Sequence, residues 1–260
     1  MKLTAKNINF AVNGKIILQN ISYEFVEGKR TGIIGANGAG KSTLLKILSL
    51  LNKNYTGEVK IDEEDIKKIP RWELAQKIAI LTQEREVPLD TTVRQLTSYG
   101  RFPHQKLFQK GKPQEDLNAI EWALEVTKMK FYEERQVSSL SGGERQRAWL
   151  SMVLAQKPQI LMLDEPTTYL DIKHQLEVMK IISDINKKYG MTIIMVLHDL
   201  NQARMFTDDL IVIKDKKIIR SGNPKEILNI ELVREVFGVK AEIYKNFRGQ
   251  SVLVPLEVEN

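Results

Sequence analysis

The feature that most constrains the fold of this chain is a glycine-rich loop between an apolar strand and a helix. Thr31–Gly35 is short and apolar, and it leads into Gly-Ala-Asn-Gly-Ala-Gly-Lys-Ser at residues 35–42. This segment matches the pattern G-x-x-x-x-G-K-[ST], and helical spacing follows over Ser42–Leu51. Its glycines let consecutive backbone N–H groups turn inward around a phosphate, and the helix start adds its positive dipole end. The order of strand, loop and helix therefore predicts an α/β fold with a phosphate-binding loop.

The residues of this loop are expected to share the binding of a nucleotide. The Lys41 ammonium is long enough to reach the outer phosphates, and the Ser42 hydroxyl is a suitable ligand for Mg²⁺. The expected nucleotide-binding set is Gly35, Ala36, Asn37, Gly38, Ala39, Gly40, Lys41, Ser42 and Thr43. The alternative is a glycine-rich turn that binds nothing, which the flanking strand and helix argue against.

Two carboxylates follow a second buried strand. Ile160–Leu163 is a continuous apolar run that ends in Asp164 and Glu165. Side chains at the carboxyl end of a parallel strand face the ligand crevice of an α/β sheet. We expect Asp164 to hold Mg²⁺ and Glu165 to orient or deprotonate a water for attack on the γ-phosphate. The pair alone is also typical of a solvated loop, so this prediction depends on the phosphate loop.

Polar residues end two further strands. Gln83 follows the apolar strand Ile78–Leu81, and His198 follows Thr192–Leu197. Both are expected to enter the same crevice, where His198 would bond the γ-phosphate and Gln83 would contact the metal or its water. A satisfied structural hydrogen bond is the alternative for either residue taken singly.

A second anion-binding helix start is predicted at Ser141–Glu144. Its paired glycines, Gly142 and Gly143, expose backbone N–H groups just before the helical run Arg145–Gln156. The alternative is a helix cap and nothing more, with Ser141 as the capping residue. A second anion site has an evident use, because it can close over a nucleotide held by another copy of the protein.

The amino-terminal segment is predicted to form antiparallel sheet. Lys2–Val12 alternates irregularly, Asn13-Gly14 is a tight-turn signal, and Ile16–Leu18 and Ile21–Phe25 continue the sheet. Phe10 lies in this sheet. Its ring either stacks on an adenine or, as is usual for a single apolar residue in a strand, packs in the core.

The sequence pattern changes between residues 84 and 156. Apolar runs typical of buried strands disappear there, and segments such as Leu117–Lys130 have helical spacing. Apolar runs return at 160–163 and 192–197, and the segment between them is predicted to be an amphipathic helix with Gly190 as its C-terminal cap. Two hairpins are expected further along the chain, over 210–220 and 241–254. We therefore predict a nucleotide-binding core over 1–83 and 157–260, which includes the antiparallel β subdomain, and an inserted helical subdomain over 84–156.

Composition excludes several classes of site. The 260 residues include no cysteine, which excludes disulfides and thiol catalysis, and the three histidines are too scattered for a zinc site. The net charge of +6 comes from interleaved basic and acidic residues, which argues against nucleic acid as a partner. The longest apolar run, Ile193–Leu197, is far shorter than a membrane span, and residues 1–10 lack the apolar stretch of a signal peptide. We expect the chain to remain inside the cell.

These motifs, in this order, resemble those of the ATP-binding-cassette (ABC) family over nearly the whole chain. The matching segments are the Walker A loop GANGAGKST, the Q-loop Gln83, the signature LSGGERQR from Leu140, the Walker B run ILMLDE, the D-loop Pro166–Asp171 and the switch His198. LSGGE is the most specific of them, because other phosphate-loop ATPases lack it. The resemblance implies a RecA-like, Mg²⁺-dependent ATPase. The implied catalytic residues are Lys41, Gln83, Glu165 and His198, the implied Mg²⁺ ligands are Ser42, Gln83 and Asp164, and Asp171 is the D-loop aspartate.

A narrower resemblance is to the ATPase subunits of bacterial importers for ferric siderophores. It rests on YGRFPH from Tyr99, LSGGERQRAWLSM from Leu140 and DEPTTYLDIKHQLEV from Asp164. This resemblance implies a homodimer that sandwiches two ATP molecules, two integral membrane permease subunits and an external substrate-binding protein. It also implies a peripheral position at the cytoplasmic face of the cell membrane, where Gln83 and the helical subdomain would sense the permease.

Two segments depart from the family's usual pattern, and other functions remain as alternatives. Phe10 stands where Tyr is common, and Thr168–Asp171 reads Thr-Tyr-Leu-Asp where Ser-Ala-Leu-Asp is frequent. A soluble cassette ATPase of iron–sulfur cluster assembly is one alternative function, and a haem or cobalamin importer is another. A DNA-repair cassette is disfavoured because no sustained heptad pattern interrupts the chain, and a GTPase because Asn-Lys-x-Asp is absent.

Overall fold

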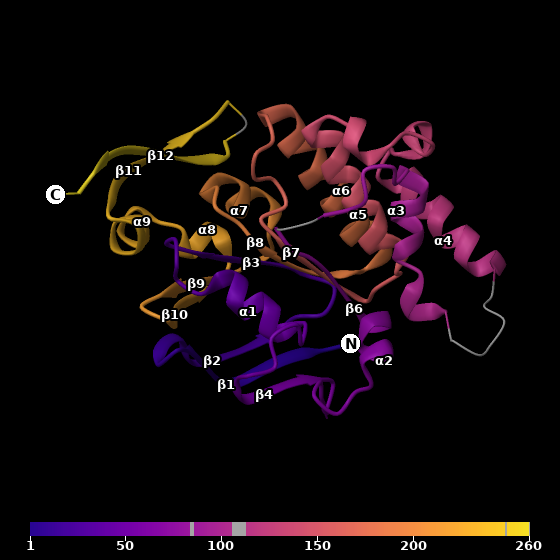
Figure 1. Ribbon diagram of the computed structural model, residues 1–260. Coiled ribbons are helices and arrows are strands. Elements are labelled where there is room, and N and C mark those ends of the chain that lie inside the picture. Colours follow the sequence, from indigo (N-terminus) through magenta and orange to yellow (C-terminus); the bar gives the residue numbers. More distant parts are fainter. Residues whose placement is uncertain (84–85, 106–112, 248, 260) are drawn as a thin grey trace. The chain divides into compact units, whose positions relative to one another are not determined.

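The strand, loop and helix predicted around the glycine-rich segment are present in the computed structural model, which describes residues 1–83, 86–105, 113–247 and 249–259 (Figure 1). The chain forms two compact units: unit 1 holds Glu64–Ile193 together with Met1, and unit 2 holds Lys2–Glu63 and Ile194–Asn260. The predicted helical subdomain, 84–156, falls within unit 1. Its first residue, Glu84, lies outside the described part of the chain, and its boundaries stay a prediction.

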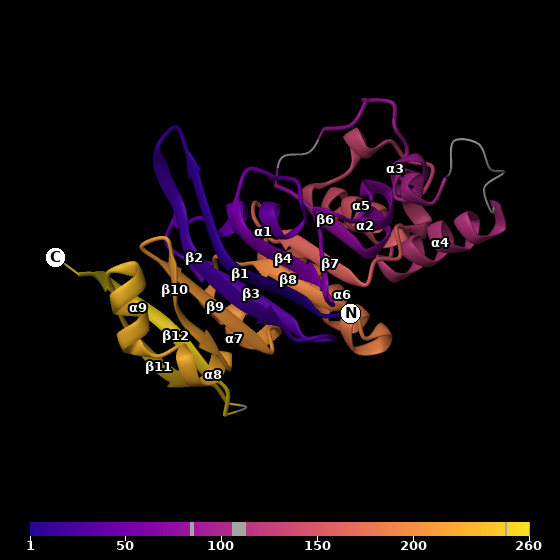
Figure 2. The same cartoon turned by 90° about the horizontal axis from the view of Figure 1, so that it is seen from below.

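Unit 2 begins with an antiparallel sheet of β1 (Leu3–Val12), β2 (Lys15–Phe25) and β4 (Thr56–Ile61). Figure 2 shows β1 and β2 side by side as a long ribbon. Asn13 and Gly14 have positive φ angles of 49° and 76°, as the predicted two-residue turn requires. The sequence predicted two strand segments after this turn, whereas β2 is continuous. Asn20 adopts a left-handed φ of 51° within it, and its N–H donates to the Asn9 side chain at 2.8 Å, so the irregularity does not end the strand.

Unit 2 also contains the buried strands β3 (Arg30–Gly35) and β9 (Asp209–Lys214). The chain continues from β9 into β10 (Lys217–Gly222), and α1 (Lys41–Leu48) contacts β3. β3 and β9 are parallel, with Ile33 opposite Ile211. β9 and β10 form the predicted hairpin, and its turn residues Asp215 and Lys216 have φ angles of 47° and 69°. α1 ends at Leu48 rather than at the predicted Leu51, because Leu50 adopts a left-handed φ of 58° that cannot continue a helix.

The carboxyl-terminal part of unit 2 combines short helices with the second predicted hairpin. Its elements are α7 (Leu200–Phe206), α8 (Pro224–Ile227), α9 (Ile230–Phe237), β11 (Val239–Lys245) and β12 (Ser251–Val258). β11 and β12 are antiparallel, which confirms the hairpin, and both strands are longer than predicted. Val233, Ala241 and Leu253 form a small buried cluster that joins α9 to this hairpin.

Unit 1 contains the second pair of buried parallel strands. Its elements outside the helical region are β5 (Glu64–Asp65), α2 (Arg71–Lys77), β6 (Ile78–Leu81), β7 (Ile160–Asp164), α6 (Ile172–Tyr189) and the start of β8 (Thr192–Val196). Ile78 of β6 lies opposite Ile160 of β7, and every residue of β7 is buried. α6 ends at Gly190, whose φ of 65° confirms the predicted left-handed cap.

The rest of unit 1 is mainly helical. The helices are α3 (Val93–Tyr99), α4 (Pro113–Val126) and α5 (Gly142–Ala155), with short 3₁₀ turns at Phe102–His104, Lys130–Tyr132 and Val137–Ser139. The three α-helices contact one another, and α5 is buried along most of its length. α4 ends earlier than the predicted helical segment, since Lys128 has a left-handed φ of 59°. Among the described residues, no helix has the length and apolar character needed to cross a lipid bilayer.

Candidate functional site

The phosphate loop of unit 2 curves around its own lysine. Lys41 is the first residue of α1 and only 5% exposed, and its Nζ donates to the carbonyl oxygens of Gly35 at 2.9 Å and Ala36 at 3.0 Å. These bonds hold the ammonium within the curve of the loop, next to the backbone of its first residues. A cation fixed beside the start of a helix is suited to an anionic ligand such as a phosphate.

Two glycines of this loop are required by both conformation and space. Gly35 and Gly40 have φ angles of 154° and 98°, which L-residues rarely adopt. A Cβ atom on Gly35 would lie 2.2 Å from the carbonyl oxygen of Ile213, and one on Gly40 would lie 2.6 Å from Leu18 Cδ2. The loop therefore keeps its curve because strands β2 and β9 approach its backbone closely.

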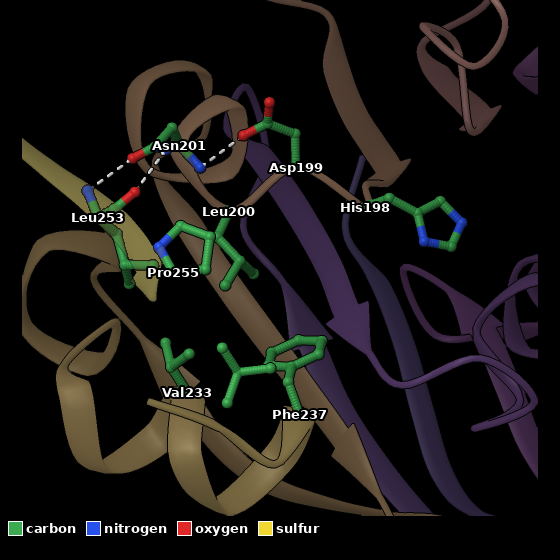
Figure 3. Close-up of a pocket in the computed structure, with 9 residues that line it drawn as sticks. His198, Asp199, Leu200, Asn201, Val233, Phe237, Leu253 and Pro255 are labelled. Carbon is green, nitrogen blue, oxygen red and sulfur yellow. Dashed lines mark hydrogen bonds between the residues drawn. The ribbon is translucent and has the colours of Figure 1, made fainter. Parts of the chain in front are cut away.

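Phe10 and His198, also in unit 2, have contrasting surroundings. Phe10 lies opposite Leu18 in the β1–β2 pair and is only 9% exposed, so most of its ring is used in core packing. Its predicted role in stacking on adenine stays a prediction. His198 follows β8 and is exposed, and its ring points away from the apolar residues near it (Figure 3).

A pocket of about 490 Å³ lies beside the chain that follows His198. Figure 3 shows its apolar lining, which includes Val233 and Phe237 from α9 and Leu253 from β12. At its edge the Asn201 side chain makes two hydrogen bonds of 2.9 Å with the backbone of Leu253, donating to its carbonyl and accepting from its N–H. The closing hairpin is thereby tied to α7, the helix that begins two residues after His198.

In unit 1 the structure brings together two residues that the sequence placed at separate strand ends. The Gln83 amide Nε2 donates to Glu165 Oε2 at 3.3 Å. Thr168 Oγ1 donates to the same oxygen at 3.1 Å. The contact of Thr168 with Glu165 was not predicted from the sequence. The position of Thr168, three residues after Glu165 in a short turn, is the sequence feature that could have indicated it. Both donors in these two hydrogen bonds, an amide and a hydroxyl, are neutral groups.

The backbone around these carboxylates is unusual. Asp164 is the last residue of β7 and 3% exposed. Glu165 has a left-handed φ of 53°, a conformation that costs about 1–2 kcal/mol for a residue other than glycine. Such strain is typical of functional positions, and here it turns the chain sharply after Asp164 while leaving Glu165 in reach of Gln83.

The signature segment forms the capped start of α5. Ser141 is the N-cap: its Oγ accepts from the Glu144 N–H at 3.4 Å, and its own N–H donates to Glu144 Oε2 at 2.9 Å. The bond from the Ser141 backbone holds the pKa of Glu144 below its usual value. The capping interpretation of Ser141 is therefore confirmed, and the anion-binding role of this segment stays a prediction. Asp171 likewise caps α6, since it accepts from the His174 N–H at 2.9 Å.

The residues predicted to hold Mg²⁺ offer the right kind of ligand atom. Ser42, Gln83 and Asp164 present hydroxyl, amide and carboxylate oxygens, which suit this hard cation. Ser42 belongs to unit 2, and the other two belong to unit 1. Within the part of the chain that the structure describes, no group of three or more His, Asp or Glu side chains could form a complete metal cage. Taken singly, each of these residue types suits Mg²⁺ that arrives with nucleotide phosphates and keeps some of its waters.

Comparison with known proteins decides the family. The ABC transporter family model matches residues 18–168. The petrobactin import ATP-binding protein FpuC of Bacillus anthracis is 42% identical over 94% of this chain and 89% of its own length. This chain belongs to the ABC transporter family. Its ATP-binding and ATPase assignments follow from this membership.

Other members of the family and several solved structures are similar to this chain over most of their length. The ferric enterobactin transport ATP-binding protein FepC of Escherichia coli is 40% identical over 98% of this chain and 94% of its own length. A dimeric bacterial ABC transporter cassette is 28% identical, with a TM-score of 0.73 over 85% of this chain and 98% of that one. A chain from an inward-facing structure described as a metal-chelate type ABC transporter has a TM-score of 0.85 at 24% identity, over 98% of this chain and 97% of that one, and this similarity supports the α/β fold.

Proposed function

We propose that this ABC ATPase powers the import of ferric siderophores through membrane permease subunits. The observation that carries the proposal is the similarity to relatives named for such cargo along nearly the whole chain. FpuC is named for petrobactin, FepC for ferric enterobactin, and the Bacillus subtilis protein FhuC, 42% identical over 93% of this chain, for iron(3+)-hydroxamate. These relatives share one class of cargo although their siderophores differ.

Two copies of the chain form the working unit in this proposal. The phosphate loop around Lys41 holds ATP in one copy, and Ser141–Glu144 of the other copy closes over the same nucleotide. The N–H groups at the start of α5 support this role, because the first N–H groups of a helix point out of its N-terminus and suit an anion. The dimeric structure of a similar bacterial cassette supports a working unit of two copies.

The chemistry rests on residues with separate tasks. Lys41 and His198 bind the outer phosphates, while Ser42, Gln83 and Asp164 hold Mg²⁺, which supplies neutralising charge at the phosphates when bound. Glu165 orients the attacking water and accepts its proton. The hydrogen bonds from Gln83 and Thr168 support this role, since they fix the carboxylate oxygen without neutralising it.

The partners follow from the importer assignment. The ATPase lies at the cytoplasmic face of the membrane against two integral membrane permease subunits, and an extracytoplasmic substrate-binding protein delivers the cargo. Gln83 links the permease to the reaction, because a shift of its segment would change the hydrogen bond to Glu165. Closure of the ATP-bound dimer and its reopening after hydrolysis drive the permease.

Uptake measurements test this proposal directly. Cells that lack the protein are given labelled ferric siderophores of the hydroxamate and catecholate classes, with haem and cobalamin alongside. We expect loss of uptake for one siderophore class, restored by the wild-type chain but not by Glu165→Gln. The Lys173→Ala variant, which changes an exposed residue outside the proposed machinery, is the matched control and should restore uptake.

Each other outcome has a clear meaning. Selective loss of haem or cobalamin uptake would overturn the siderophore assignment and leave the importer assignment in place. Intact uptake of every ligand in cells without a second such ATPase would refute the importer assignment. A soluble ATPase of iron–sulfur cluster assembly would then be the leading alternative, and the enzyme should not copurify with membranes.

A further inference from the structure

The second glycine of the signature segment packs directly against a histidine of the next helix. A Cβ atom on Gly143 would lie 1.5 Å from His174 Cδ2, 2.3 Å from its Cγ and 2.6 Å from its Nε2. Carbon atoms in ordinary contact are about 3.5–4.0 Å apart, so the imidazole occupies the space that a side chain at position 143 would need. Gly143 has helical backbone with no positive φ, and space rather than conformation is what requires glycine there.

The first signature glycine lacks this constraint. Among the described residues, a Cβ atom on Gly142 would meet Leu170 Cδ2 alone within 4 Å, at an ordinary contact distance of 3.8 Å. The two adjacent glycines therefore differ within one chain. Of the two glycines, Gly143 is the one whose Cβ position the His174 ring occupies.

The same ring faces the D-loop. His174 Nδ1 is buried and has no hydrogen-bond partner among the described residues. The nearest carboxylate oxygens are Asp171 Oδ1 at 3.4 Å and Glu177 Oε2 at 4.0 Å. The backbone N–H of His174 also donates to Asp171 Oδ1 at 2.9 Å, which holds the backbone of His174 beside the aspartate that ends the D-loop.

An ion pair next to the ring also joins the two helices. Arg147 of α5 is 9% exposed, and its Nη1 donates to Glu177 Oε2 of α6 at 2.9 Å. α5 and α6 are therefore joined by this ion pair and by the His174–Gly143 contact one turn away. The first turn of the signature helix and the D-loop cannot shift independently while both ties are in place.

We propose that His174 is a positioning residue that locks the signature turn to the D-loop of the same chain, so that both reach the partner copy in one fixed arrangement. The inference rests on the proposed ATP-bound dimer. His174 does not contact the nucleotide in this arrangement. It acts through Gly143 and Asp171, and its loss should impair dimer closure while leaving the binding of ATP to the phosphate loop unchanged.

A double-mutant cycle in full-length protein tests the contact. The variants are Gly143→Ala, His174→Ala and the two combined, all in a Glu165→Gln parent that retains ATP, with Lys173→Ala as the matched control on α6. ATP-dependent dimer formation is measured by sedimentation velocity. The affinity of the monomer for a fluorescent ATP analogue is measured separately, at protein concentrations too low for dimers.

We expect His174→Ala to weaken dimer formation about tenfold and Gly143→Ala to weaken it further, with ATP affinity within about twofold of the parent in both. The double variant should recover to the level of His174→Ala alone, because removing the ring makes room for the new methyl group. A double variant no better than Gly143→Ala would overturn the proposal. So would a His174→Ala variant that dimerises as well as the Lys173→Ala control.

Urea unfolding of the same proteins separates this proposal from the proposed function. If the parent fails to dimerise with ATP, the proposed dimer is refuted, and with it the role of His174 in closing that dimer. Coupling between Gly143→Ala and His174→Ala in the unfolding midpoints would still show whether the ring and the glycine share one space. A loss of dimer formation that simply follows the unfolded fraction would mean that His174 only stabilises the fold, which also overturns the proposal.

Discussion

Two glycine-rich helix starts, one in each unit, use glycine for different physical reasons. In the phosphate loop of unit 2, Gly40 has a φ of 98° and its backbone lies against the Leu18 side chain, so both conformation and space exclude other residues. In the signature segment of unit 1, Gly143 has ordinary helical backbone and only the His174 ring excludes a side chain. Gly142 has no positive φ, and no atom of the described residues crowds its Cβ position. A glycine-rich motif thus combines glycines that shape the backbone with glycines that make room for a neighbour.

The largest expected effect comes from removing the chemistry while leaving both helix starts intact. Glu165→Gln should lower ATP turnover by about 10²–10⁴-fold, because the amide cannot accept the proton of the attacking water. ATP-bound dimers should persist and can be followed by size-exclusion chromatography with light scattering. Turnover at the wild-type rate would contradict the assignment of Glu165 as the base.

Lys41→Ala tests the phosphate loop without changing its glycines. The variant removes the ammonium held by the Gly35 and Ala36 carbonyls, and ATP should bind about ten- to a hundredfold more weakly through loss of a charge-assisted contact. Equilibrium titration with a fluorescent ATP analogue measures this change. An unchanged affinity would show that Lys41 does not reach the phosphates, and Lys46→Ala, in the last turn of the same helix, is the matched control.

Alanine at single glycines tests the comparison itself. Gly40→Ala should lower the free energy of unfolding by about 1–3 kcal/mol, since the methyl group clashes with Leu18 and the backbone is left-handed. Gly142→Ala should leave that free energy unchanged or raise it by up to about 1 kcal/mol, because alanine favours helix. Urea denaturation distinguishes the two. Equal destabilisation by the two substitutions would show that contacts within the chain also require glycine at position 142.

The smallest expected effect is on the acid stability of unit 2. Arg30, the first residue of β3, holds the pKa of Asp208 below its usual value of 3.8, mainly through a side-chain hydrogen bond. Because the pKa is lower in the folded state, the stabilisation is fully present above about pH 4 and is lost as the pH falls through the folded-state pKa. Asp208→Asn should flatten the acid limb of the thermal unfolding midpoint against pH. An unaltered pH profile would mean that the Arg30–Asp208 pair contributes nothing to it.

Several elements were predicted correctly because their signals are local. The Asn13-Gly14 turn and the Gly190 cap depend on residues that accept a positive φ, and the buried strands Ile160–Leu163 and Thr192–Leu197 are continuous apolar runs. The boundaries of α1 and β2 were less accurate. Leu50 adopts a left-handed conformation that its residue type does not favour, whereas Asn20, a residue type that tolerates this conformation, adopts it inside β2 without ending the strand.

The sequence by itself determined the family and the residues that carry its motifs, because phosphate binding requires particular residue types at fixed spacing along a strand, loop and helix. Tertiary structure decided the relations between segments far apart in the chain. The bond of Gln83 to Glu165 spans 82 residues, and the contact of His174 with Gly143 joins two helices. Neither has a local sequence signal, since side chains on separate elements meet only after the strands and helices that carry them have packed.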